Sequence, residues 1–137
     1  EMCIRDSDKK EDVKYILISE KGCADPSAEY SLELADGLLP LDIHTFDKDA
    51  FILENEQVHK VTLYTKEKKA CLSLHFHTPV VGLWSPPAKN APFVCIEPWY
   101  GRCDRAHYTG EYKDKDWMQH LHPDKTFKGG YTIEIEE

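Results

Sequence analysis

The strongest constraint on the fold is that the apolar residues come in short runs, none of which has the sustained periodicity of a long amphipathic helix. Charged residues, glycines and prolines separate the runs, as they do between strands. We expect strands over residues 13–18, 30–34, 50–54, 58–65, 70–77, 80–84, 91–97 and 131–136. Many short strands without long helices predict an all-β fold, an antiparallel β-sandwich or barrel.

The segments between the strands carry recognisable turn chemistry. Asp25-Pro26-Ser27 and Asp36-Gly37 are predicted turns, and the lysine-rich loop 66–69 joins two of the strands into an antiparallel hairpin. Residues 41–49 are polar and are expected to form a short helical turn capped by Asp42. A second helical turn is expected over residues 116–121.

Composition and charge narrow the classes of partner. The 137 residues amount to one domain, and 41% of them are hydrophobic, which is enough for a packed core. A net charge of −8 argues against nucleic acid and anionic membranes as partners, and no apolar run is long enough to cross a bilayer. The five cysteines include no Cys-x-x-Cys pair, so we expect reduced thiols, a cytoplasmic protein and no zinc site.

The first seven residues have no strand or helix continuity with the sequence that follows. The sequence opens on Glu1-Met2-Cys3-Ile4-Arg5-Asp6-Ser7, which resembles a translated adaptor remnant and has no apolar core of a signal peptide. We therefore interpret residues 1–8 as a non-native leader and leave them out of the fold prediction. Residues 9–137 are interpreted as the C-terminal part of a longer domain.

The stretch 91–104 carries the best candidate chemistry. An apolar run, expected to be a strand buried on both faces, delivers Glu97 as its last ladder residue and stops at Pro98. Trp99 and Tyr100 follow directly. A fixed carboxylate beside aromatic rings suits a sugar, because the acid takes hydroxyl protons and the rings cover C–H faces. The alternative is a solvated glutamate at the end of a strand, with both rings in an ordinary core.

The same stretch resembles the C-terminal signature of the aldose 1-epimerase (galactose mutarotase) superfamily, in its LacX-like branch. The resemblance extends over roughly residues 13–137 in ordered blocks, which are 39–41 leading into 46–55, then 81–85, 91–104, and finally 108–110 with the terminal 130–135. It implies the C-terminal portion of a galactose mutarotase-like β-supersandwich, with strand edges that a missing half would cover. It also implies an isomerase that interconverts the α and β anomers of a free aldose without a cofactor.

The resemblance assigns roles to particular residues. Glu97 is implied as the general base that takes the proton of the anomeric hydroxyl. The family's acid histidine, in a His-Pro-x-aromatic motif, has no counterpart here, since His122-Pro123 lacks the aromatic residue. The fragment is therefore expected to be inactive alone. The residues expected to contact the sugar substrate are Asp49, Asp47, Trp84, Trp99 and Tyr100.

Two other interpretations stay open. One is a non-catalytic carbohydrate-binding β-sandwich module that keeps the aromatic and acidic lining without turnover. The other is a cupin-type metal site at His75 and His77, whose side chains share one face of a strand, although no carboxylate follows them. Arg102 is expected to form a surface ion pair rather than to reach Glu97 or a substrate. The sequence does not indicate an oligomeric state.

Overall fold

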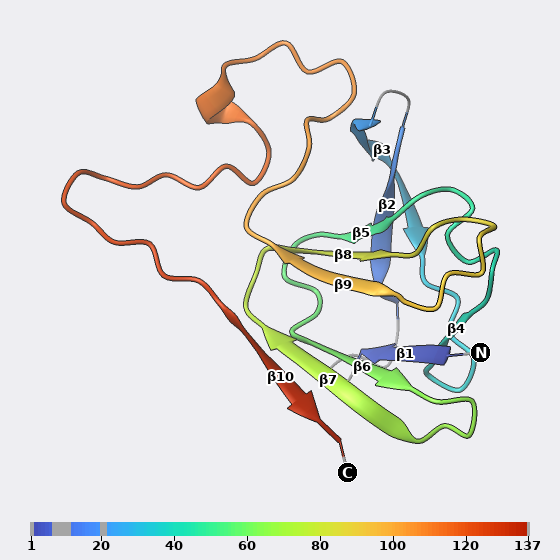
Figure 1. The fold of residues 1–137 in the computed structure, drawn as a ribbon. Helices are drawn as coiled ribbons and strands as arrows, with labels where there is room; N and C mark the ends of the chain where they lie inside the picture. The colour runs from blue at the N-terminus through green and yellow to red at the C-terminus, as the bar shows by residue number, and fades with distance from the viewer. Residues whose placement is uncertain (1, 7–11, 20–21, 137) are drawn as a thin grey trace.

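The computed structural model describes residues 2–6, 12–19 and 22–136, and it consists of two five-stranded antiparallel sheets (Figure 1). The first sheet has the order β10-β7-β6-β1-β4, with strands Tyr131–Ile135, Ala70–Phe76, Lys60–Tyr64, Met2–Asp6 and Leu39–Leu41. The second has the order β3-β2-β5-β8-β9, with strands Ala24–Ser31, Lys14–Ile18, Phe51–Leu53, Val80–Trp84 and Cys95–Trp99. The predicted all-β antiparallel sandwich is confirmed.

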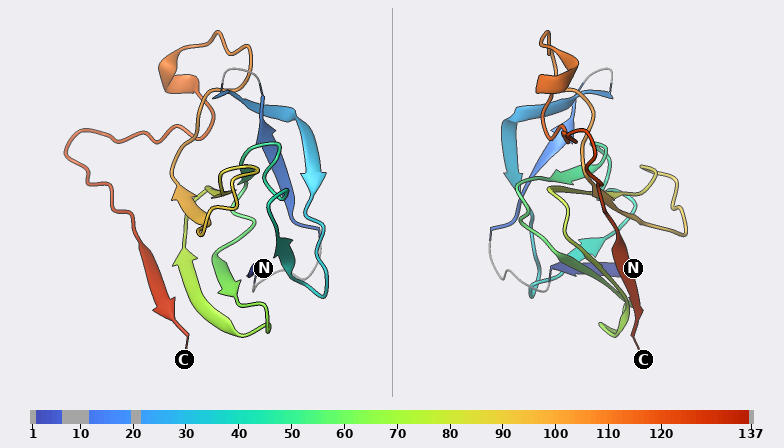
Figure 2. Two further views of the ribbon diagram at one scale, coloured as in Figure 1. Left: turned by 45° about the vertical axis from the view of Figure 1, so that its right-hand side comes forward. Right: turned by 90° about the vertical axis from the view of Figure 1, so that its left-hand side faces the viewer.

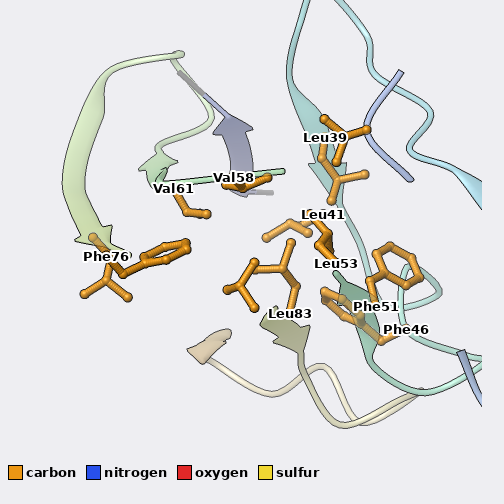
Figure 3. Packing of buried hydrophobic residues seen from close by; sticks show 12 residues of the cluster. Leu39, Leu41, Phe46, Phe51, Leu53, Val58, Val61, Phe76 and Leu83 are labelled. Atoms are coloured by element: carbon orange, nitrogen blue, oxygen red, sulfur yellow. The ribbon is translucent and has the colours of Figure 1, made fainter. Parts of the chain in front are cut away.

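The main core lies between the two sheets (Figure 3). Alternation along β6 and β7 turns Val61, Leu74 and Phe76 inward, and β5 and β8 contribute their own inward residues. Burying each such side chain contributes about 1.5–3 kcal/mol, so this layer is the main stabilising element of the sandwich. The buried residues of the cluster are Val13, Leu39, Leu41, Phe46, Phe51, Leu53, Val58, Val61, Leu74, Phe76, Val81 and Leu83.

A smaller cluster lies on the outer face of the second sheet. Ile16, Ile52 and Val80 are buried there, and two half-buried tryptophans, Trp99 and Trp117, pack against them with Ala24 and Ile18. Trp117 belongs to the segment that follows β9, and two hydrogen bonds near Ala24 tie the beginning of that segment to β3. The segment after β9 therefore covers part of a sheet face that would otherwise be exposed.

The hairpin of residues 58–77 is confirmed as β6 and β7, and the turn at Asp36-Gly37 is confirmed by a bridge between Ala35 and Leu38. Asp42 accepts a hydrogen bond from the His44 amide (2.7 Å), but residues 42–48 form turns rather than a helix. The helical turn expected over 116–121 is wrong. The short 3-10 helix in this region spans Tyr112–Asp114 instead.

The strand predicted over 30–34 lies earlier in the chain. β3 includes the predicted turn at Asp25-Pro26-Ser27, so that turn prediction is wrong. The reason is that β3 is an edge strand, where a proline can direct its missing N–H away from the ladder, and the register shift opposite Ile16 leaves the extra residues 26–29 in β3 itself.

β9 also differs from its prediction. It lies at the edge of the second sheet, its residues are half-buried, and its ladder continues past Glu97 through Pro98, which pairs with Val81, to Trp99. Glu97 is therefore neither on a fully buried strand nor the last ladder residue. Proline is tolerated in β9 because an edge strand does not need every N–H in the ladder.

Residues 2–6 form β1, which pairs with both β4 and β6, so a strand lies in a segment that the sequence prediction left out. Pairing does not test the origin of the segment, and the leader interpretation of residues 1–8 stays a prediction. Residues 1 and 7–8 lie outside the described residues.

The C-terminal arm, residues 120–136, extends outward from the sandwich and ends in β10, the edge strand of the first sheet (Figure 2). Every residue of β10 is exposed although the strand pairs with β7 along its whole length. Large apolar side chains are exposed along this arm, among them Ile135 at 69%. In the described part of the chain, no helix has the length and apolar character needed to cross a membrane.

Candidate functional site

The candidate site lies on the outer face of the second sheet. Strand alternation along β9 places Glu97 and Trp99 on this face, while Ile96 packs against the core between the sheets. Across the ladder, Glu97 pairs with Gly82 and Trp99 pairs with Val80. The two residues that the sequence singled out as acid and aromatic platform therefore share one surface.

Gly82 is what lets the tryptophan lie flat beside the acid. A Cβ atom at Gly82 would approach Trp99 Cζ2 to 2.6 Å and Cη2 to 2.7 Å, closer than real Cβ contacts. The indole therefore rests on the bare backbone of β8. From that position Trp99 Nε1 donates a hydrogen bond to Glu97 Oε2 (3.2 Å), which orients the carboxyl group. The signal in the sequence was a glycine inside a strand, which marks a close approach.

Glu97 and Trp99 line an open concavity of about 450 Å³ together with Trp84 and Asp49. These residues come from β8, β9 and the turn before β5, so three segments far apart in sequence meet there. The remaining lining residues are Ile18, Gly22, Ala50, Gly101, Arg102 and Cys103. Four of the six residues expected at the site are thus brought together, and the mixture of aromatic rings with carboxylates fits a polyhydroxylated ligand.

Asp49 occupies an unusual backbone position. Its φ of 76° is in the left-handed region, and its Oδ1 accepts a hydrogen bond from the Ala50 amide (2.7 Å). Aspartate tolerates this conformation better than most residues, because its short side chain bonds to the local backbone. The side chain is exposed, which leaves Oδ2 available to a ligand in the concavity.

The other two expected residues lie elsewhere. Asp47 is exposed and its Oδ2 lies 2.9 Å from His44 Nδ1. Tyr100 packs edge-on against Phe127, with ring centroids 4.9 Å apart, and it lines a separate hollow beside β10. Neither residue lines the concavity that holds Glu97.

Neighbouring ionisable groups respond to this environment. The pKa of the Cys95 thiol is raised, first by burial and then by the nearby Glu97 carboxyl group. The pKa of Asp116 is lowered, chiefly because Arg105 donates a hydrogen bond to it, and Arg102 acts in the same direction. Burial raises the pKa of Cys103 in the wall of the concavity.

Comparison with known proteins identifies relatives of this chain in sequence and in structure. No protein-family model matches the chain. The LacX proteins of Lactococcus lactis subsp. lactis, plasmid and chromosomal, are 32% identical over 98 residues, which is 71% of this chain and 32% of each relative. A galactose mutarotase related enzyme from Lactobacillus acidophilus superposes with a TM-score of 0.83 at 27% identity, over 99% of this chain and 45% of the other.

The chain is similar to LacX proteins and to galactose mutarotase-related proteins, as the sequence resemblance to the aldose 1-epimerase (galactose mutarotase) superfamily implied. Its resemblance is to the LacX-like members. A galactose mutarotase-like protein from Lactobacillus casei ATCC 334 shares the fold, with a TM-score of 0.76 at 22% identity over 96% of this chain and 44% of the other. The chain spans about a third of the length of the LacX proteins and under half of the two solved chains.

One group of residues in this chain was missed by sequence reasoning. The Arg102 side chain is 1% exposed and pairs with Glu54 and with Asp116, at 2.7 Å in the second case. The expected surface ion pair is therefore wrong, because Arg102 is covered by the segment that follows it. Glu54 also accepts a hydrogen bond from Trp117 Nε1 (2.7 Å). No sequence signal links residues 48 to 63 positions apart.

The histidines expected for a cupin-type site have other partners in the structure. His75 Nε2 lies 2.7 Å from Glu134 Oε2 on β10, whereas the ring of His77 packs against His59 at 5.1 Å between centroids. Among residues 2–6, 12–19 and 22–136, no three histidine, cysteine or acidic side chains are grouped to hold a metal ion. The arrangement at Glu97 is therefore the better candidate for a functional site in this chain.

Proposed function

We propose that the chain is the base-bearing part of an aldose 1-epimerase-like isomerase that interconverts the α and β anomers of a free aldose, with Glu97 as general base. The observation that carries the proposal is the concavity in which Trp99 orients the Glu97 carboxyl group beside Trp84 and Asp49. The names of the structural relatives support the same class, since one is a galactose mutarotase related enzyme.

The reaction needs one base and one acid. The Glu97 carboxylate takes the proton from the anomeric hydroxyl, and the O–H electron pair forms the carbonyl at C1. The bond from C1 to the ring oxygen breaks as an acid donates a proton to that oxygen. Rotation about C1–C2 and reclosure on the other face, with both proton transfers reversed, give the other anomer. No cofactor takes part in these steps.

The acid must come from outside the described concavity. Its lining, as the structure describes it, contains neither histidine nor lysine. We propose that residues 9–137 are the C-terminal part of the functional domain and that the acid belongs to the rest of it. The exposed apolar residues of β10 support a further part that covers this arm.

Charge supports an uncharged sugar. Asp49 and Glu97 line the concavity, and the cation that lines it, Arg102, is already paired with Glu54 and Asp116. Among the lining residues that the structure describes, a phosphorylated or acidic sugar would meet carboxylates without an unpaired cation to balance them, which costs affinity. We propose that the uncharged sugar contacts Asp49 and the indoles of Trp84 and Trp99. The unpaired thiols of Cys23, Cys71, Cys95 and Cys103 support a cytoplasmic location.

Titration and polarimetry test the proposal. We expect D-galactose or D-glucose to shift the indole N–H signals of Trp84 and Trp99 in NMR spectra, and E97Q to weaken that response. E111Q, at an exposed loop position away from the concavity, is the control and should respond like the unaltered chain. No response of either indole to either sugar at tens of millimolar would refute the proposal.

A carbohydrate-binding module without turnover is the second candidate, favoured by the lack of an acid in the lining. The two are separated by polarimetry of fresh α-D-galactose. We expect residues 9–137 alone to add little to the buffer rate. A protein that supplies the acid should accelerate mutarotation, and E97Q should remove about a hundred- to ten-thousand-fold of that gain. Binding without acceleration in such a protein would identify a binding module.

A further inference from the structure

Arg102 makes three directional contacts from a side chain that is almost wholly buried. Its Nε donates to Glu54 Oε1, its Nη2 donates to Asp116 Oδ2 (2.7 Å), and its Nη1 donates to the carbonyl of Cys103 (3.0 Å). The guanidinium group is a planar fork, so these contacts fix its orientation as well as its distance from each acceptor.

The two carboxylates belong to different parts of the fold. Glu54 directly follows β5, in the middle of the second sheet, whereas Asp116 lies in the segment after β9. Trp117 strengthens the same connection, since its indole N–H bonds to Glu54 and its ring packs against the outer cluster near Val80. Arg102 therefore joins the centre of the sheet to the covering segment at two points.

The residues held in this way form a wall of the candidate site. Gly101, Arg102 and Cys103 line the same concavity as Glu97 and Asp49. A buried ion pair of this kind gives little net stability, because desolvation of both charges offsets their attraction. The main effect of these contacts is on geometry, because the guanidinium group fixes where residues 101–103 lie relative to the sheet face that carries Glu97.

We propose that Arg102 is a positioning residue that holds residues 101–103 as the wall of the sugar site. This inference rests on the proposed function for its consequence in binding. The positive charge of Arg102 is already paired with Glu54 and Asp116, so the residue shapes the site and does not neutralise a ligand.

Three variants separate positioning from charge and from folding. E54Q/R102M removes both charges of the inner pair, and the glutamine can still accept from Trp117. R102K keeps the charge but not the fork. R105A is the matched control, because Arg105 pairs with the same Asp116, is half exposed and does not line the concavity.

We expect the dissociation constant for D-galactose, from the indole signals of Trp84 and Trp99, to rise at least tenfold in E54Q/R102M. It should rise less in R102K and stay within twofold in R105A. Independently of sugar, amide hydrogen exchange at Ala24 and Ala106, whose N–H groups join β3 to the segment after β9 (2.8 Å each), should accelerate at least tenfold in E54Q/R102M, while exchange in β6 and β7 stays unchanged.

The outcomes are distinguishable. Sugar binding equal to that of the unaltered chain in E54Q/R102M, or unchanged exchange at Ala24 and Ala106, would overturn the positioning role. If the unaltered chain binds neither D-galactose nor D-glucose, the proposed function fails. Exchange at Ala24 and Ala106 then still decides whether Arg102 holds the wall, since acceleration confined to these amides supports it.

Discussion

Replacement of Gly82 by alanine tests the packing on which the candidate site is built. The added methyl group would lie 2.6 Å from Trp99 Cζ2 and 3.2 Å from Cε2, so the indole must move away from β8. Moving it breaks the hydrogen bond from Trp99 Nε1 to Glu97 Oε2. Both the fold and the orientation of the acid should therefore respond to one substitution.

The expected magnitude follows from three contributions. Crowding of a packed ring costs about 1–3 kcal/mol. Loss of a half-buried hydrogen bond to a carboxyl group costs about 1.5 kcal/mol. Alanine in place of glycine in a strand returns about 0.5–1 kcal/mol through the unfolded chain. The free energy of unfolding should fall by about 2–3 kcal/mol as a result of these three terms.

Urea unfolding followed by circular dichroism measures this change. With a slope of about 1–3 kcal/mol per molar urea, the midpoint should fall by about 1–2 M. G130A is the control, because a Cβ atom there meets nothing within 4 Å, and its stability should be unchanged or slightly raised. The reasoning is refuted if G82A and G130A unfold at the same midpoint with the Trp99 indole signal in its original position.

Three further predictions address other parts of the molecule. The folded pKa of Asp116 is depressed, so its stabilising contribution is present above the ordinary carboxyl value and is lost as the pH falls through the folded value. Between about pH 5 and 2 the urea midpoint should thus fall more steeply for the unaltered chain than for D116N, and parallel curves would contradict this. T62V removes a buried hydroxyl that lies 2.8 Å from Ser73 Oγ, and should destabilise the chain by about 1–2 kcal/mol in the same assay. A change below a few tenths would mean that this pair contributes nothing. I133K places a charge on the exposed edge strand β10, and should reduce self-association in light scattering without changing the midpoint, whereas a large loss of stability would show that Ile133 is packed in solution.

The sequence predicted the sandwich because short alternating runs such as 70–77 are read directly from local pattern. It also predicted that Glu97 and Trp99 act together, as a carboxylate followed by an aromatic residue, but it ended the strand at Glu97. In the structure β9 continues to Trp99, so alternation places both side chains on one face. What it could not supply were relations set by sheet order. Pro98 can stay in the ladder because β9 is an edge strand. The edge position follows from the pairing of β9 with β8, which no local pattern contains.

The site shows the same division. Trp84 and Asp49 were proposed from a resemblance, and only the fold shows that they meet Glu97 while Asp47 and Tyr100 do not line the same hollow. The pairing of Arg102 with Glu54 joins residues 48 positions apart, so no local pattern contains it. The sequence shows Gly82 as a glycine within a strand, but only the structure shows why a side chain is excluded there, which is that the Trp99 ring occupies the space.

The outermost place of β9 has a consequence for how a complete catalytic centre could be assembled. In the described chain its only strand neighbour is β8, so the other side of its backbone is open to one more strand. A strand that paired there opposite Glu97 would bring its own side chains to within about 5 Å of the carboxyl-bearing position. Sheet extension and delivery of a proton donor would then be a single docking event.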